Sequence, residues 1–158
     1  MMENKLELEA LAELCAQQEE QFQFESFSRQ DALRLGLQLA EAARAYSAGV
    51  AIEITINGLS VFRYFPEGTT MDNSLWLARK ARTVSLTGVS SLHAYANLEL
   101  SGETLDDRKL DPKDYAFCGG GFPLLIRGVG MVGVIAVSGL PHLEDHALIA
   151  ETLEEIFG

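Results

Sequence analysis

Two histidines near the C-terminus have the spacing of a pair of metal ligands. His142 and His146 are four residues apart, so both imidazoles would lie on one face of a helix, with the acid Asp145 between them. A zinc hydrolase also needs a third protein ligand, and no residue at a suitable spacing supplies one. Pro141 and the acids that follow it are typical of an ordinary first helical turn. The pattern therefore favours a helix start with a partly buried His146 over zinc chemistry.

A run of three glycines could bring backbone amides close to an anion or to a flat ligand. Gly119 and Gly120 open this run, which leads into Phe122-Pro123, and the Lys-Ser/Thr pair of a P-loop does not follow. Three glycines more often solve a tight crossing of two chain segments, although close approach of a flat ligand needs the same absence of side chains. Cys118, directly before the run, adds a thiol to this segment.

A short basic cluster stands out in a strongly acidic chain. Arg79, Lys80 and Arg82 follow Trp76 by about one helical turn, whereas the whole chain has 23 acidic and 12 basic residues. A forked guanidinium could hold a ligand carboxylate while the indole covers an apolar face. Alternatively, Arg79 and Lys80 pair with acids of a neighbouring helix or subunit, and Trp76 belongs to the core.

Composition narrows the class of protein. A chain of 158 residues with 47% hydrophobic residues is long enough for one core, so residues 1–158 are expected to form a single domain. The net charge of −11 opposes binding to a phosphate backbone or an anionic bilayer, which predicts no nucleic-acid and no membrane partner. We find no signal-like start and no long apolar run, and the two cysteines are far apart. A cytoplasmic protein with reduced thiols is expected.

The hydrophobic pattern predicts the elements that must position these residues. Residues 1–20 contain a helix with Leu8, Leu11, Leu14 and Cys15 on one side, suited to packing on another subunit. Ser28 and Asp31 resemble a capping signal, and Asp72 can cap a third helix. Asn57-Gly58 indicates a hairpin with a type I′ turn. Helices are expected over 3–19, 29–47, 72–88, 90–100 and 142–157, and strands over 22–27, 50–56, 59–65, 123–127 and 131–138.

This order of elements favours one fold class. Two hairpins make antiparallel neighbours, so the economical architecture is an α+β domain with a central five-stranded, mostly antiparallel sheet flanked by helices. Its appearance would be profilin-like or PAS-like.

The separate motifs resemble one known family when they are taken in order. They are Asp72-Asn73-Ser74-Leu75-Trp76-Leu77-Ala78-Arg79-Lys80, Ser90-Ser91, Asp111-Pro112-Lys113-Asp114-Tyr115-Ala116-Phe117, Gly119-Gly120-Gly121-Phe122-Pro123, Val137-Ser138-Gly139-Leu140-Pro141 and Asp145-His146. The chain is similar over nearly its whole length to the haem-degrading-domain family of HbpS- and GlcG-like proteins, and most of all to its bacterial and fungal branch. The resemblance implies homo-oligomers and, for some relatives, binding of haem or a corrinoid and slow haem breakdown.

The resemblance also marks a candidate ligand site. Its residues are Trp76, Arg79, Lys80, Ser90, Ser91, Cys118, Gly119, Gly120, Asp145 and His146. Arg79 or Lys80 would pair with haem propionates, and His146 or Cys118 would reach the iron. The chain departs from the family at Cys118, where relatives usually have His, and at His142, where Gln is common. Two alternatives remain: a non-enzymatic homo-oligomeric scaffold or adaptor, and a binding module for another small metabolite.

Overall fold

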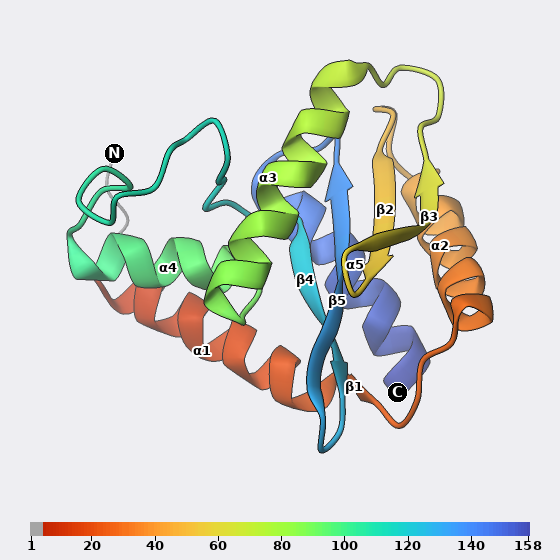
Figure 1. The fold of residues 1–158 in the computed structure, drawn as a ribbon, viewed down its shortest axis with the longest axis horizontal. Helices are drawn as coiled ribbons and strands as arrows, with labels where there is room; N and C mark the ends of the chain where they lie inside the picture. The colour runs from red at the N-terminus through yellow and green to blue at the C-terminus, as the bar shows by residue number, and fades with distance from the viewer. Residues whose placement is uncertain (1–4) are drawn as a thin grey trace.

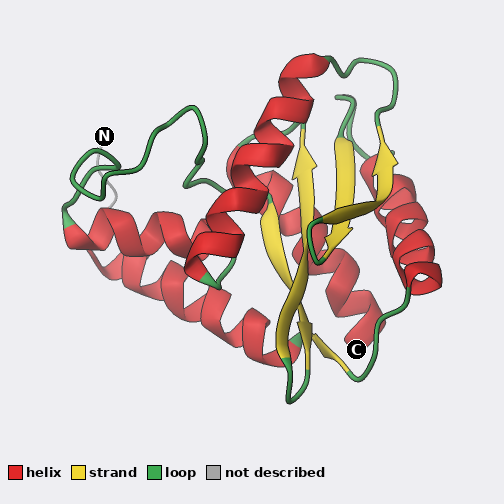
Figure 2. Ribbon diagram, viewed as in Figure 1, coloured by secondary structure: helices red, strands yellow, loops and turns green. Residues whose placement is uncertain are grey.

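The computed structural model describes residues 5–158 and shows one sheet with helices on both of its faces (Figures 1 and 2). The strand order is β1-β4-β5-β2-β3. The elements are α1 (Lys5–Gln21), β1 (Gln23–Phe24), α2 (Arg29–Ala43), β2 (Ala51–Ile56), β3 (Leu59–Tyr64), α3 (Met71–Thr87), α4 (Ser91–Ser101), β4 (Gly121–Ile126), β5 (Gly130–Ser138) and α5 (His142–Phe157). The predicted α+β class is confirmed.

The sheet is built from two hairpins joined along a central seam. Asn57 and Gly58 both have positive φ, at 49° and 82°, which is what the predicted type I′ turn between β2 and β3 requires. β4 and β5 form the second hairpin, and β5 pairs antiparallel with β2. Among the strands of the described residues, β1 alone pairs in parallel, with its neighbour β4. The sheet is therefore mostly antiparallel, as predicted, and β4 begins at Gly121, two residues before the expected strand.

The helix starts follow capping chemistry, with one correction. Ser28 and Asp31 form the predicted capping box of α2. The predicted cap of α3 at Asp72 is wrong, because the Thr70 hydroxyl accepts the Asp72 amide at 3.2 Å and Asn73 Oδ1 accepts the Thr70 amide at 2.9 Å. Asp72 lies instead in the first turn, where its negative charge interacts favourably with the positive end of the helix dipole.

The second helix is shorter than expected because its C-terminus is a series of turns. It ends at Ala43 rather than near Ser47, and Arg44, in a right-handed conformation, is its cap. Gly49 does not end the helix. A Cβ on Gly49 would collide with the Glu67 carbonyl oxygen, so this glycine serves the crossing of two loops.

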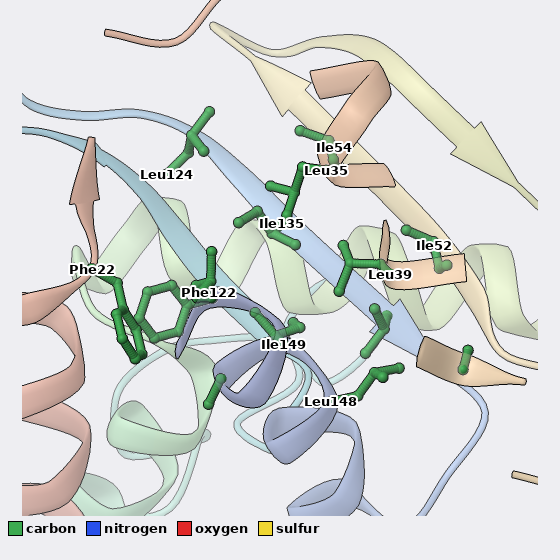
Figure 3. Close-up of a cluster of buried hydrophobic side chains, with 14 of the residues drawn as sticks. Phe22, Leu35, Leu39, Ile52, Ile54, Phe122, Leu124, Ile135, Leu148 and Ile149 are labelled. Carbon is green, nitrogen blue, oxygen red and sulfur yellow. The ribbon is translucent and has the colours of Figure 1, made fainter. Parts of the chain in front are cut away.

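The main core lies between the sheet and the layer of α2 and α5 (Figure 3). Leu39 of α2 and Ile149 of α5 contribute to it, together with Ile52 and Ile135 of the central strands. On the opposite face, α3 packs Leu77 against small side chains of β2 and β5. This arrangement places one face of α3 beside the start of α5, across the end of β5.

The first helix packs on α4 of the same chain. Leu8 and Cys15 are buried, whereas Leu14 is 49% exposed, so the predicted apolar side of this helix is divided between two faces. Among the described residues, no helix is long and apolar enough to cross a membrane.

Candidate functional site

A cavity of about 310 Å³ opens between α3 and the start of α5. It is lined by Asp72, Asn73, Trp76, Lys80, Cys118, Ser138, Gly139, Leu140, His142 and Asp145. Four of the predicted site residues meet here, from three segments far apart in the chain. A larger hollow of about 640 Å³, between the end of α2 and β3, contains none of the predicted residues.

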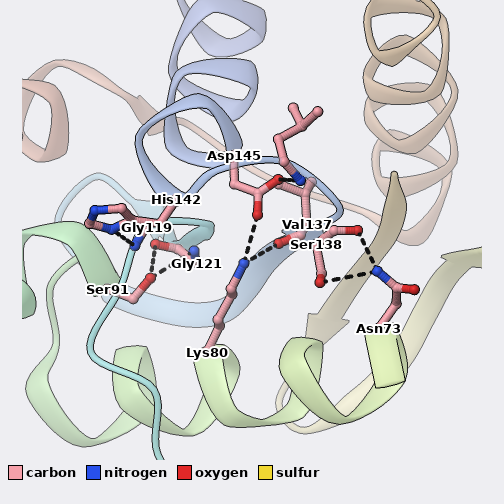
Figure 4. A network of polar contacts seen from close by, with 10 residues as sticks. Asn73, Lys80, Ser91, Gly119, Gly121, Val137, Ser138, His142 and Asp145 are labelled. Carbon is pink, nitrogen blue, oxygen red and sulfur yellow. Dashed lines mark hydrogen bonds and ion pairs between the residues drawn. The ribbon is translucent and has the colours of Figure 1, made fainter. Parts of the chain in front are cut away.

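A buried ion pair lies at the base of this cavity (Figure 4). Lys80 Nζ lies 2.9 Å from Asp145 Oδ2 and donates to the Val137 carbonyl oxygen, also at 2.9 Å. The Leu140 amide donates to Asp145 Oδ1 at 3.1 Å. Burial raises the pKa of Asp145, and the Lys80 charge acts in the opposite direction. Of the two interpretations for Lys80, the structure bears out pairing with an acid of a neighbouring helix.

The glycine run is a tight crossing that the protein fills with its own atoms. Gly120 has φ +123°, and a Cβ there would lie 2.5 Å from Lys80 Nζ. A Cβ on Gly119 would collide with the His142 carbonyl oxygen. Gly121 donates its amide to Ser91 Oγ at 2.8 Å (Figure 4). The missing side chains are thus required by the fold itself, independently of any ligand.

The imidazole of His142 is held by the same crossing. The Gly119 amide donates to His142 Nδ1 at 3.0 Å, and the ring makes an edge contact with Tyr95. Because Nδ1 accepts this bond, a neutral ring carries its proton on Nε2. His142 is half-buried and lines the cavity, although it was not among the predicted ligand-site residues. Among the described residues, no group of three His, Cys, Asp or Glu could hold a metal ion.

The indole of Trp76 borders the opening of the cavity. It is 37% exposed, so the interpretation of Trp76 as a core residue is wrong. The Arg79 guanidinium carbon lies 4.9 Å from the centre of the indole, and Arg79 Nε donates to the Lys113 carbonyl oxygen at 3.1 Å. Among residues 5–158, no acid forms an ion pair with Arg79, in contrast to Lys80. Its guanidinium is thus held beside Trp76 by stacking and by a loop carbonyl.

The thiol of Cys118 is half-buried in the cavity wall. Burial raises its pKa, Lys80 acts to lower it, and Asp145 acts to raise it. Burial is the largest of these effects, so the thiol is protonated at neutral pH.

Six of the ten predicted residues do not line the cavity: Arg79, Gly119 and Gly120, described above, and Ser90, Ser91 and His146. Ser90 caps α4 and donates its amide to Glu19 of α1, and Ser91 is buried against Gly121. His146 is only 4% exposed and contacts Gln18 Oε1 through Nε2 at 2.7 Å. Burial lowers the pKa of His146 to about 4. Its ring is therefore neutral, and it is almost wholly buried rather than partly buried as expected.

Sequence reasoning missed two polar residues of the cavity. Asn73 Nδ2 donates to the Ser138 carbonyl oxygen at 3.2 Å, and Ser138 Oγ lies 3.4 Å away (Figure 4). Both residues fall within the motifs that carry the family resemblance. A signal for Asn73 was present in its position three residues after Thr70, which is typical of a capping box.

Solved structures share this fold and define its class. The crystal structure of Ybr137w protein matches with a TM-score of 0.85 at 28% identity, covering 92% of this chain and 87% of that one. The crystal structure of HbpS matches with a TM-score of 0.66 at 20% identity, covering 86% of this chain and 93% of that one. The structure of a PduOC:haem complex matches with a TM-score of 0.66 at 22% identity, covering 81% and 92%. The class is thus an α+β domain with the fold of HbpS.

The family follows from the sequence comparisons. The model described as haem degrading protein HbpS-like matches residues 27–154, so the chain belongs to the HbpS-like family. A UPF0303 protein of Streptomyces coelicolor is 42% identical over 143 residues, covering 90% of each chain. A UPF0303 protein of Yersinia enterocolitica is 37% identical over 145 residues, covering 91% of this chain and 86% of that protein. The resemblance found in the motifs is confirmed.

Proposed function

We propose that the protein binds haem, or a related tetrapyrrole, in the cavity between α3 and α5. One observation carries the proposal: Trp76, Cys118 and His142 line the same opening. An indole face covers a flat ring, and imidazole and thiolate are both ligands of haem iron. Membership of the HbpS-like family and the fold shared with the haem-bound PduOC support this ligand class.

Among the candidate iron ligands, the geometry favours His142. The thiol of Cys118 is neutral because burial raises its pKa, and His146 contacts Gln18 outside the cavity. Iron binding at His142 would replace the Gly119 bond to Nδ1 or remove the proton from Nε2. Loss of one such hydrogen bond costs about 1 kcal/mol, which iron coordination can offset. A haem held there would supply an iron centre for binding oxygen or transferring electrons.

The remaining predicted contact is between a basic side chain and the haem propionates. The Lys80 ammonium already bonds to Asp145 and to the Val137 carbonyl, so it is not the cation that would pair with a propionate. Arg79 has five N–H donors, of which Nε bonds the Lys113 carbonyl. Arg79 is therefore the cation at the mouth that suits a carboxylate. A cavity of about 310 Å³ is near the lower limit for ligand pockets, so a macrocycle would remain partly at the surface beside Trp76.

Absorbance titration with haemin tests the proposal. We expect a saturable Soret shift in the wild type, and an apparent Kd raised at least about tenfold in His142→Ala and in Trp76→Ala. Cys118→Ser and His146→Leu serve as controls and should retain binding, with folding checked by circular dichroism. A wild-type protein that leaves the haemin spectrum unchanged at micromolar concentration would overturn the proposal. Loss of the shift in Cys118→Ser alone would assign the iron to the thiol instead.

A second candidate function is a non-enzymatic homo-oligomeric scaffold or adaptor. The observation that favours it is the internal bonding of Lys80, Ser90, Ser91, Asp145 and His146, each of which has a partner within the chain. An unchanged haemin spectrum together with a multi-subunit mass would support this function. Binding of a different flat metabolite would instead depend on Trp76 and be insensitive to His142→Ala.

A further inference from the structure

The larger cavity of the molecule lies between α2 and β3 and shares no lining residue with the cavity between α3 and α5. Its volume of about 640 Å³ is within the range of small-molecule sites. α2 and β3 lie side by side and end at the same end of the sheet (Figure 1). The turns that follow them close the cavity there, because Gly49 and the Glu67 carbonyl are in direct contact. Leu37 and Ala40, on one face of α2, form an apolar wall.

Three aromatic side chains line this cavity: Tyr46, Phe62 and Tyr64. The Phe62 ring packs directly on α2 at Gly36, where a Cβ would lie 2.4 Å from three ring atoms. Tyr46 is half-buried and Tyr64 is 47% exposed. Among residues 5–158, no hydrogen bond, ion pair or ring contact involves the side chain of Tyr46 or of Tyr64. Both rings are therefore available to the apolar surface of a ligand.

Both arginines that line the cavity are neutralised by acids of this chain. Arg44 Nη1 lies 3.3 Å from Glu41 Oε2, so these two charges compensate each other within the wall. Arg63 Nε lies 3.3 Å from Glu53 Oε2, and its Nη2 donates to Ser74 Oγ at 2.6 Å. Ser74 belongs to α3, which covers the other face of the sheet, so the Arg63 guanidinium points away from the cavity.

Glu67 is the remaining charged side chain among the described residues of the lining. It is exposed, and no side chain within residues 5–158 forms a hydrogen bond or an ion pair with its carboxylate. The C-terminus of α2, which carries a partial negative charge, belongs to the same wall. The uncompensated charge at this end is thus negative, and it lies beside aromatic rings, whose faces attract cations.

We propose that this cavity binds a small organic cation, an amine or a quaternary ammonium group carried on an apolar body. The cationic group lies between the Glu67 carboxylate and the Tyr64 ring, and the apolar body lies against Phe62 and Leu37. A neutral ligand would gain nothing from Glu67, and an anion would be repelled by it. This site does not depend on haem binding.

Isothermal titration calorimetry with three probes of similar body and different charge tests this site. The probes are benzyltrimethylammonium, neutral benzyl alcohol and anionic 3-phenylpropanoate, each titrated to millimolar concentration. We expect saturable binding of the cation to one site, and at least about tenfold weaker binding of the other two. Glu67→Gln keeps the shape of the side chain and removes its charge, so it should raise the Kd of the cation at least about tenfold. Tyr64→Ala should raise it about threefold or more.

A matched variant controls for the change in net charge. Glu151→Gln makes the same alteration on an exposed residue of α5, outside the cavity, and should leave the Kd unchanged. Circular dichroism of each variant checks that the fold is intact. Equal affinity for the three probes, no saturable binding of the cation, or a folded Glu67→Gln or Tyr64→Ala variant with the wild-type Kd would each overturn the proposal. Equal weakening by Glu151→Gln and Glu67→Gln would also overturn it, because the cation would then respond only to overall charge.

Discussion

Replacing Lys80 by methionine tests how much the buried ion pair contributes to stability. The side chains of Lys80 and Asp145 are 4% and 2% exposed, so the substitution leaves a carboxylate in the interior without its counter-ion. The Val137 carbonyl also loses its 2.9 Å donor. Removing one partner of a buried pair destabilises a protein by about 3–5 kcal/mol. For a chain of this size, that corresponds to a melting temperature lower by roughly 6–20 °C.

The loss of stability in Lys80→Met should depend on pH, whereas a loss caused by packing alone would not. Burial already raises the pKa of Asp145, and without Lys80 it rises further, because that ammonium opposes the effect of burial. A carboxyl with a raised folded-state pKa protonates more readily in the folded than in the unfolded protein. The loss from Lys80→Met should therefore be largest at neutral pH and shrink as pH falls toward 4.

Urea denaturation followed by circular dichroism, at pH 7 and near pH 4.5, measures both effects. Lys80→Met/Asp145→Asn keeps an oxygen for the Leu140 amide and removes the unpaired charge, so it should be more stable than Lys80→Met by at least about 1 kcal/mol at pH 7. Lys113→Met, at a lysine that is 83% exposed, is the surface control and should cost less than about 1 kcal/mol. A Lys80→Met loss below 1 kcal/mol, or an equal loss at both pH values, would refute the reasoning.

Three further predictions concern other parts of the site. Gly120→Ala should cost more than about 2 kcal/mol, since its Cβ would meet a buried ammonium, whereas Gly102→Ala, with open space at its Cβ position, should cost about 1 kcal/mol; thermal melts compare them. Burial lowers the pKa of His146 to about 4, so the unfolded chain takes up a proton at this ring more readily than the folded protein. The free energy of unfolding should therefore fall by about 3 kcal/mol between pH 6.5 and pH 4. His146→Leu should lack this loss in paired urea titrations. A thiol reagent should modify Cys118 before Cys15, because Cys15 is fully buried with its pKa raised to about 11; equal labelling rates by intact mass would contradict this.

Much of the fold was predictable because its signals are local. The Asn57-Gly58 turn and the Ser28–Asp31 capping box each depend on residues within a few positions of one another. The short strand β1 is different. It pairs in parallel with β4, joining Gln23 to Leu125, and a local sequence pattern does not predict a partner so distant in the chain. Asp72 was misassigned as a cap because Thr70, two residues earlier, offers an equally suitable hydroxyl.

The candidate site was predicted as a set of residues but without its geometry. The motifs named Lys80 and Asp145 separately, and their pairing across 65 positions emerges only from the fold. The resemblance gave His146 or Cys118 as the iron ligand, yet the ring of His146 contacts Gln18, and the cavity is lined by His142 instead. Burial and side-chain direction depend on tertiary packing, which the spacing of residues in one sequence does not encode.

The seam between the two hairpins has a consequence for how the chain reaches its native state. Each hairpin closes a short loop, so β2–β3 and β4–β5 can form within about 1–10 μs. The β2–β5 pairing instead joins Ile52 to Val137, 85 residues apart, and has to wait for a much less probable encounter. The rate-limiting event of folding is therefore expected to be the meeting of two preformed halves along this seam. Substitutions there should slow folding, whereas substitutions in α1 should mainly speed unfolding.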